Sequence, residues 1–354
     1  MPVIICCCTV DEGVLMAKRD FYVRESELDD FQRKILNSNT DKSFIVQGCA
    51  GSGKSILALW KAHDIQKNNK GSVQVIVYTK ALKSYMEAAM RDIGIDSSTV
   101  DYYHQWDKKR QQSKYIIVDE AQDFSQEAID SFRENAEFVV LYGDSAQQMY
   151  IFRKDNPPMS MSEIEHLTSF PKEQLVYNHR LPKKIARVAQ CLSNVSDVLD
   201  ERCRNEGSEK PYFLQYDSIS LQLDGIVNIV RNRDFEDVGI LLPDNDAVDR
   251  VAQHLRDRDI QVESKSRSEI DFNWSSSLPK LMTYWQAKGL QFEAVFIPIL
   301  NPLREDVKPA LYVAMTRTYQ SLYVMYSDGM PPIFSSIPQN LYDTSLTSSH
   351  VELL

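Results

Sequence analysis

Residues 44–55 read FIVQGCAGSGKS, an apolar run that leads directly into a glycine-rich turn. From residue 48 onward the stretch matches the pattern G-x-x-x-x-G-K-[ST]. Its glycines let the backbone curl so that N–H groups point at phosphate oxygens, and the helix that follows adds the positive end of its dipole. In such a loop the lysine reaches the β- and γ-phosphates, and the last hydroxyl ligates Mg²⁺. The stretch therefore predicts a site for ATP and Mg²⁺ formed by Gly48, Cys49, Ala50, Gly51, Ser52, Gly53, Lys54 and Ser55.

A second apolar run ends in two acidic residues. Residues 115–120 read YIIVDE, which places Asp119 and Glu120 at the carboxyl end of an expected strand. In parallel sheets, ligands bind beyond the carboxyl ends of the strands. Asp119 would hold the Mg²⁺ shell, and Glu120 would orient and deprotonate an attacking water. The alternative is a solvated acidic strand end, which the spacing from the phosphate loop disfavours.

The chain alternates short apolar runs with amphipathic stretches along most of its 354 residues. The expected strands are 44–47, 73–78, 115–118, 138–142, 174–177, 238–242, 280–283, 294–300 and 321–326, and the expected helices are 55–67, 81–93, 182–192 and 247–257. This rhythm predicts an α/β fold with parallel sheets and helices on both faces. We expect two domains, residues 1–160 and 161–330, followed by a loosely held tail, residues 331–354.

Composition narrows the class of protein. The net charge of −10 argues against a basic coat for nucleic acid, but it is compatible with a narrow basic track. The six cysteines show no disulfide or zinc framework, and we expect the run Cys6-Cys7-Cys8 to form a buried strand rather than a lipidation or redox site. No run reaches the ~18 apolar residues of a membrane helix. The sequence therefore predicts a cytoplasmic protein.

Further motifs surround the phosphate loop and the acidic pair in a fixed order. They are Phe31-Gln32; Asp119-Glu120-Ala121-Gln122-Asp123; Gly143-Asp144-Ser145-Ala146-Gln147; Asn178-His179-Arg180; Thr283 with Ala287-Lys288-Gly289-Leu290-Gln291-Phe292; and Leu311-Tyr312-Val313-Ala314-Met315-Thr316-Arg317. With these motifs the chain resembles the superfamily 1 helicases, in particular the UvrD/Rep-like group, over residues 28–326. The resemblance implies two RecA-like P-loop NTPase domains and an ATPase that acts on single-stranded DNA.

The resemblance assigns three residues to the nucleoside part of ATP. Gln32 would read the adenine base. His179 stands where the family has a tyrosine that stacks on adenine, and a histidine would stack more weakly. Gln291 stands where the family has a glutamate that contacts the ribose, and it can still form a hydrogen bond with a hydroxyl.

The resemblance also assigns the catalytic set. Lys54 and Glu120 would act as described above. Arg180 and Arg317 would reach the γ-phosphate from the second domain across a solvated cleft, where arginines stabilise the charge of phosphoryl transfer. Gln147 would link the γ-phosphate to the nucleic acid. ATP would then pull the two domains together, and hydrolysis would release them.

The resemblance places a nucleic-acid track as well. Single strands are held by backbone contacts and by aromatic side chains that stack on bases. The residues expected on the track are Thr79, Lys80, His104, Trp106, Phe152, Thr283 and Trp285. For each aromatic residue the alternative is packing in the core.

Two segments typical of the UvrD/Rep-like group are missing. Between Trp106 and Asp119 lie only a basic run, residues 108–110, and the expected strand. Little chain separates residues 260–262 from Thr283. The resemblance therefore implies a minimal motor without the two inserted accessory domains, which would unwind long duplexes poorly by itself.

Two functions remain open at this point. The first is an ATP-driven translocase or helicase on single-stranded DNA, with RNA as an alternative track. The second is an ATP-controlled switch, or a regulatory ATPase subunit of a nuclease or defence complex, that does not move processively. We expect a protein partner such as a nuclease and no membrane. Stimulation of ATP hydrolysis by single strands distinguishes the motor from the switch.

Overall fold

The computed structural model describes residues 27–93, 95–149, 155–193, 198–266 and 272–346. The strand expected at residues 6–8 and the expected track residue Phe152 lie outside these ranges. Among the described helices, none combines the length and the apolar character needed to cross a membrane.

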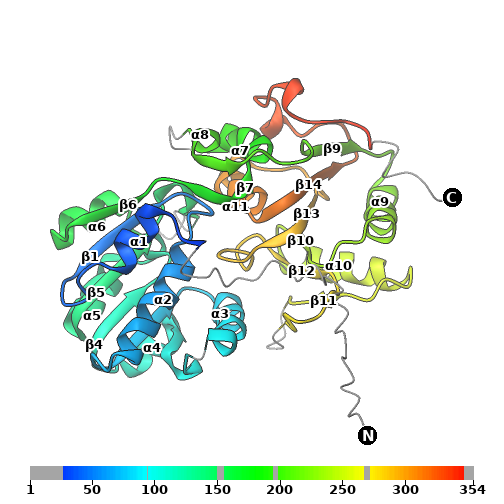
Figure 1. Cartoon of the computed structure of the whole chain (residues 1–354). Helices are drawn as coiled ribbons and strands as arrows, with labels where there is room; N and C mark the ends of the chain where they lie inside the picture. Colours follow the sequence, from blue (N-terminus) through cyan, green and yellow to red (C-terminus); the bar gives the residue numbers. More distant parts are fainter. Residues whose placement is uncertain (1–26, 94, 150–154, 194–197, 267–271, 347–354) are drawn as a thin grey trace, which may run out of the picture.

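Two six-stranded parallel sheets form the two halves of the molecule (Figure 1). The first sheet has the strand order β3-β2-β4-β5-β1-β6, the second has the order β11-β12-β10-β13-β14-β9, and β7 pairs with β8 alone. The strands are β1 Phe44–Gly48, β2 Val73–Val77, β3 Val100–Tyr102, β4 Ser113–Val118, β5 Ala136–Gly143, β6 Lys172–Leu175, β7 Asn178–Pro182, β8 Cys203–Asn205, β9 Tyr212–Gln215, β10 Val238–Leu242, β11 Glu263–Ser264, β12 Lys280–Thr283, β13 Phe292–Pro298 and β14 Thr318–Tyr326. The predicted α/β class with parallel sheets is confirmed.

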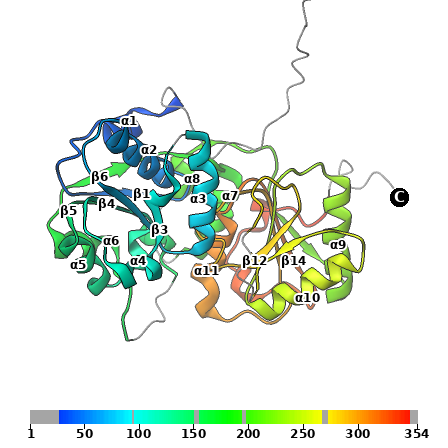
Figure 2. The same cartoon turned by 90° about the horizontal axis from the view of Figure 1, so that it is seen from below.

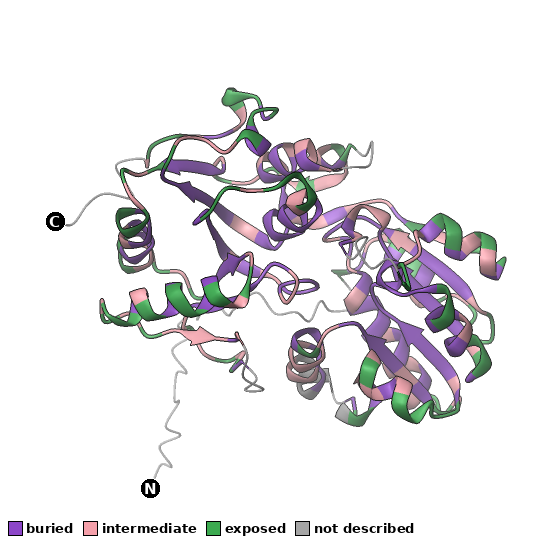
Figure 3. Ribbon diagram, turned by 180° about the vertical axis from the view of Figure 1, so that it is seen from behind, coloured by how far each residue is buried: buried purple, intermediate pink, exposed green. Residues whose placement is uncertain are grey.

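Helices cover both faces of each sheet. They are α1 Asp30–Leu36, α2 Lys54–Lys67, α3 Lys80–Ile93, α4 Tyr103–Lys109, α5 Gln126–Glu134, α6 Met161–Thr168, α7 Lys183–Ala189, α8 Leu199–Arg202, α9 Ile219–Asn232, α10 Asn245–Arg256 and α11 Lys308–Met315. The central strand β4 packs on both sides: Tyr115 and Ile117 join the core under α2 and α3, whereas Ile116 and Val118 join the core under α4 and α5. Figure 3 shows the interior strands of both sheets buried and the outer helix faces exposed. A strand covered on both faces has a continuous apolar sequence, as the run before Asp119 has.

The predicted domain boundary at residue 160 is wrong. Strand β6 pairs in parallel with β1, in a register that places Lys172 opposite Ile45 and Leu175 opposite Gly48. Helix α6 precedes this strand in the chain and packs by Ile164 into the core of the first half. The first half therefore extends to Leu175, and the chain enters the second half through β7.

The segment after residue 330 is packed, not loosely held, as far as residue 346. Ile333, Phe334 and Ile337 are buried in the second half. The backbone N–H of Phe213 donates to the carbonyl of Asp343 at 2.8 Å, so the segment also extends along β9. The predicted loose tail is thus corrected for residues 331–346.

Helix α3 belongs to the first half and packs against the second half (Figure 2). The indole N–H of Trp274 donates to Ser84 Oγ at 3.0 Å, and its ring packs edge-on against Tyr85 with centroids 5.1 Å apart. Leu82 lies so close to Gly289 that a Cβ there would approach it to 2.8 Å. Gly289 also has a φ of 80°, which other residues rarely adopt. Helix α3 therefore rests directly on the turn at residues 284–290.

Candidate functional site

The phosphate loop curls where its glycines allow it. Gly51 and Gly53 have φ angles of 73° and 88°, which glycine adopts without steric penalty. Lys54 is buried, and its ammonium donates to the carbonyls of Gly48 at 2.8 Å and Cys49 at 3.0 Å. The ammonium therefore points into the loop, where phosphate oxygens could replace these carbonyls as acceptors.

Two hard oxygen ligands meet at the end of β4. Ser55 Oγ donates to Asp119 Oδ2 at 2.5 Å, which joins the first turn of α2 to the carboxyl end of the strand. Burial and the neighbouring Glu120 raise the pKa of Asp119 to about 6. Mg²⁺ is typically held by one or two such protein groups together with phosphate oxygens. The pair fits Mg²⁺, whose positive charge would favour the ionised form of Asp119.

Glu120 has a backbone conformation that few residues adopt. Its φ is 56°, in the left-handed region, which is uncommon for residues other than glycine and is typical of functional sites. Gln122 Nε2 donates to Glu120 Oε2 at 2.6 Å. Burial raises the pKa of Glu120, but the charges of Lys288, Lys54 and Arg317 outweigh it and hold the pKa below its usual value. Glu120 is therefore an ionised carboxylate that can accept a proton.

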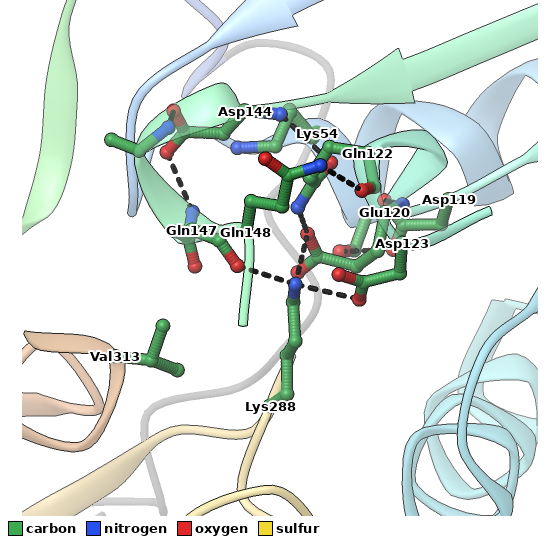
Figure 4. A network of polar contacts seen from close by, with 12 residues as sticks. Lys54, Asp119, Glu120, Gln122, Asp123, Asp144, Gln147, Gln148, Lys288 and Val313 are labelled. Atoms are coloured by element: carbon green, nitrogen blue, oxygen red, sulfur yellow. Dashed lines mark hydrogen bonds and ion pairs between the residues drawn. The ribbon is translucent and has the colours of Figure 1, made fainter. Parts of the chain in front are cut away.

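A relay of side chains connects Glu120 to the second half (Figure 4). Gln122 Oε1 accepts from the N–H of Asp144 at 2.9 Å, and Asp144 Oδ2 accepts from Gln147 Nε2 at 2.8 Å. Gln147 Oε1 then accepts from Arg317 Nη2 at 2.5 Å. Arg317 is 2% exposed. The prediction that Arg317 lies in a solvated cleft is therefore wrong, because the halves bury it between them.

A second cation crosses the same interface. Lys288 donates to the carbonyl of Gln147 at 2.6 Å and pairs with Asp123 Oδ2 at 2.6 Å (Figure 4). Its ammonium also lies 4.0 Å from Glu120 Oε2. Lys288 belongs to a motif in the sequence, but nothing in the motif's spacing indicates that its partner is Asp123. Sequence reasoning therefore missed this contact.

Arg180 lies between the phosphate loop and Arg317. The N–H of His179 donates to the carbonyl of Gly51 at 3.1 Å, which places the start of β7 against the loop. Arg180 Nη2 donates to the carbonyl of Thr316 at 3.0 Å. Its Nε is buried and has no hydrogen-bond partner among the described residues. Burial, together with the charge of Arg317, lowers the pKa of Arg180.

Gln32, the residue predicted to read adenine, contacts the phosphate loop. Gln32 is buried, and its Nε2 donates to the carbonyl of Ser52 at 3.0 Å. Its Oε1 accepts from the N–H of Asp29 at 3.0 Å as part of the capping box that begins α1. Both ends of the amide are occupied inside the protein. Gln32 therefore ties α1 to the phosphate loop, and its role toward adenine stays a prediction.

His179 and Gln291, the other two residues predicted around the nucleoside, are partly accessible. His179 Nε2 lies 2.6 Å from Asp29 Oδ2, so the histidine is oriented by an aspartate from the first half. Nearby, the guanidinium of Arg204 covers the ring of Tyr177 at 3.6 Å, and Phe31 meets the same ring edge-on. Gln291 directly precedes β13 and is partly buried. No sequence signal indicated Tyr177, which lies outside the recognised motifs.

The predicted track residues differ in how accessible they are. Lys80 and His104 are exposed and Thr79 is partly buried; all three follow the carboxyl ends of β2 and β3. Thr283 is buried, and its hydroxyl accepts from the N–H of Gln286 at 3.3 Å, so it caps a turn. Trp285 is partly accessible, and its indole N–H has no hydrogen-bond partner in the described part of the chain.

Trp106 is a core residue, and its predicted role on the track is corrected. Its side chain is 1% exposed, and its ring packs on Phe132 with centroids 4.9 Å apart. Its indole N–H donates to Gln74 Oε1 at 2.9 Å. A ring enclosed in this way cannot stack on a base.

We expect Trp106→Ala to lower the free energy of unfolding by about 3–5 kcal/mol, because the substitution removes a large buried ring. Chemical denaturation of the whole protein measures this change. Trp60→Ala is the matched control, since Trp60 on α2 is only partly buried and should cost clearly less. A Trp106→Ala protein that is as stable as the wild type but binds single-stranded nucleic acid more weakly would show that Trp106 contacts nucleic acid.

Two solved structures are similar to the chain. The C-terminal domain of a possible DNA helicase from Lactobacillus plantarum WCFS1 is 19% identical with a TM-score of 0.39, and the match covers 47% of this chain and 98% of that one. Arterivirus nonstructural protein 10, a helicase, is 16% identical with a TM-score of 0.47, and the match covers 87% of this chain. This chain spans 63% of the arterivirus protein. No curated protein matches the chain.

The family comparison covers most of the chain. The family model described as the viral superfamily 1 RNA helicase core domain matches residues 44–326. This range begins with β1 and ends with β14, so it includes the phosphate loop, the acidic pair and both cations that cross the interface. The chain belongs to the family of the viral superfamily 1 RNA helicase core domain.

Proposed function

We propose that the chain is a motor that hydrolyses ATP between its two halves and couples hydrolysis to movement along single-stranded nucleic acid. The observation that carries the proposal is the buried contact between Arg317 of the second half and Gln147 of the first. A cation that one half contributes to the other half's nucleotide site makes hydrolysis depend on how the halves meet. Membership of a helicase family supports the same class of activity.

The proposed roles follow the geometry of the site. The residues in these roles are Lys54 for the β- and γ-phosphates, Ser55 and Asp119 for Mg²⁺, Glu120 as general base, and Arg180 and Arg317 for the charge on the transferred phosphoryl group. Bound Mg²⁺ neutralises charge on the phosphates. Glu120 takes the proton of the attacking water, and its low pKa keeps it ionised for that step. The buried Nε of Arg180 has no hydrogen-bond partner within the described ranges, which supports its assignment as an anion ligand.

Measurements of ATP hydrolysis can show which kind of nucleic acid the protein acts on. The sequence predicts that the protein acts on single-stranded DNA, whereas the matching family model is described as an RNA helicase core domain. The experiment measures steady-state ATP hydrolysis with saturating single-stranded DNA, single-stranded RNA and blunt duplex of equal length. We expect strong stimulation by at least one single strand and little by the duplex. Equal rates with and without every nucleic acid would support the ATP-controlled switch instead.

We expect Trp285→Ala to weaken single-strand binding. A stacked base contributes about 1–3 kcal/mol, which corresponds to roughly 5- to 150-fold in Kd. Fluorescence anisotropy with a labelled oligonucleotide measures this change in the absence of ATP. Trp285→Phe keeps a stacking ring and should retain most of the affinity. Unchanged affinity in Trp285→Ala would assign this ring to packing.

Two finer predictions rest on the sequence. The motifs resemble those of the UvrD/Rep-like enzymes, which would link the motor to DNA repair. The short connection between α4 and β4, residues 110–112, leaves no room for an inserted domain there. A minimal motor of this kind is expected to need a protein partner, such as a nuclease, for work on long duplexes.

A further inference from the structure

Lys288 is a buried lysine of the second half whose ammonium contacts residues of the first half. Its side chain is 1% exposed, and its ammonium lies 2.6 Å from both Asp123 Oδ2 and the carbonyl oxygen of Gln147. A buried ammonium is unfavourable unless carboxylates and carbonyls surround it, so its place is fixed by these partners. In the proposed function, Lys54 and the two arginines supply the charges for the phosphates. Lys288 is therefore a charge at the site that phosphate binding does not require.

The neighbours of Lys288 link Glu120, the proposed proton acceptor, to Gln147. Glu120 Oε2 is 4.0 Å from the ammonium and is held from the other side by Gln122. Gln147 offers its carbonyl to Lys288 and its side-chain oxygen to Arg317. A displacement of Lys288 would therefore change the surroundings of Glu120 and of the residue that positions Arg317.

The turn that carries Lys288 also touches the proposed track. Residues 284–290 form this turn, which follows β12 and includes Trp285. On the other side of the turn, Gly289 packs against Leu82 of α3, and α3 begins at the exposed Lys80. A strand that contacts Trp285 and Lys80 together would fix the turn and α3 relative to each other. Lys288 lies three residues after Trp285 in the chain and directly before Gly289, the residue that packs against α3.

We propose that Lys288 is a positioning residue through which an occupied nucleic-acid track accelerates hydrolysis at Glu120. The inference rests on the proposed function, because it requires a track. Lys288 holds Asp123 and the backbone of Gln147 in place, and strand binding sets the position of its turn. The coupling between the two sites passes through one ammonium.

The test compares ATP hydrolysis by Lys288→Met and by the wild type, with and without a saturating single-stranded oligonucleotide of the kind that stimulates the wild type. Coupling between linked sites is typically about 5- to 150-fold. We expect the stimulation factor, which is kcat with the strand divided by kcat without it, to fall to near 1 in Lys288→Met. The ATP-free affinity for the strand should change little, because the ammonium faces the carboxylates. Lys288→Arg keeps the charge and should recover part of the stimulation.

Lys280→Met is the matched control. Lys280 is a fully buried lysine of the second half whose ammonium donates to the carbonyls of Ser276 and Leu278. Its loss should affect stability but leave the stimulation factor as in the wild type. Asp123→Asn removes the carboxylate partner and should lower the factor as Lys288→Met does, which gives a second measurement if the methionine variant does not fold.

Three results would overturn the inference, and they differ from each other. A wild-type stimulation factor in Lys288→Met would show that coupling takes another route. A loss of ATP-free strand affinity that matches the loss of stimulation would make Lys288 a binding residue. A wild type that no strand stimulates would contradict the proposed function itself, whereas the first two results would leave it standing.

Discussion

Arg317→Ala is expected to hydrolyse ATP ~10³-fold more slowly than the wild type at saturating ATP and single strand. Arginines that stabilise the charge of phosphoryl transfer from outside the phosphate loop contribute about 10³–10⁵ in kcat. Arg317 has the position for this role, because it enters the interface from the second half and meets Gln147 beside the carboxylates. Steady-state hydrolysis under saturating conditions measures the loss in kcat.

Burial makes controls necessary for this variant. Arg317 also donates to the carbonyl of Val313 at 2.9 Å, so alanine removes structural bonds as well as charge. Thermal unfolding and binding of a fluorescent ATP analogue report whether the fold and the loop survive. Arg133→Ala, at an exposed arginine of α5, should leave kcat unchanged. A folded Arg317→Ala protein with wild-type turnover would remove the interface from the catalytic site.

Glu120→Gln should bind ATP and hydrolyse it about 10²–10⁴-fold more slowly, the usual contribution of a positioned general base. The amide preserves the shape of the side chain but cannot accept the proton of water. Rapid-mix measurement of a single turnover separates this loss from slow product release. Nucleotide affinity should stay close to that of the wild type, because Lys54 and Ser55 are untouched.

Glu127→Gln is the matched control for the base. Glu127 is an exposed carboxylate on α5, and its substitution makes the same chemical change away from the site. It should hydrolyse ATP at the wild-type rate. If Glu120→Gln also does so, another group accepts the proton, and the assignment of Glu120 is lost.

The sequence predicted those parts of the fold that depend on residues close together in the chain. The runs at residues 44–46 and 115–118 are apolar throughout, as strands buried on both faces must be, and both became interior strands of the first sheet. The glycines at 51 and 53 indicated that the backbone curls at the phosphate loop, and both have positive φ. In these places local chemistry alone determines the structure.

The errors occur where position depends on distant contacts. Strand β6 contains only one buried residue, Leu175, so its sequence does not indicate which sheet it joins. Trp106 belongs to a motif-like segment, but its burial depends on Phe132 and Gln74, which lie far from it along the chain. The apolar residues 333, 334 and 337 were the available signal that the last segment packs against the second half.

The residues of the candidate site also divide into those that local motifs identified and those whose contacts depend on distant parts of the chain. Motifs identified Lys54, Asp119 and Glu120, because phosphate and metal binding require fixed residue types at fixed spacing. They did not indicate that Gln147 accepts from Arg317 and Lys288 together, since that arrangement is set by the docking of the two halves. The contact of Gln32 with Ser52 was missed for a different reason, because the two residues of the first half lie 20 positions apart in the chain.

The most direct test of the motor is ATP-driven movement along a single strand. The protein is bound to oligonucleotides of increasing length that carry a fluorophore at one end, and ATP is added with a trap for free protein. We predict that arrival at the labelled end shows a lag that grows in proportion to length and that disappears when Glu120→Gln replaces the wild type. A signal that does not depend on length, from a wild type that still hydrolyses ATP, would contradict the account and identify the chain as a stationary ATPase.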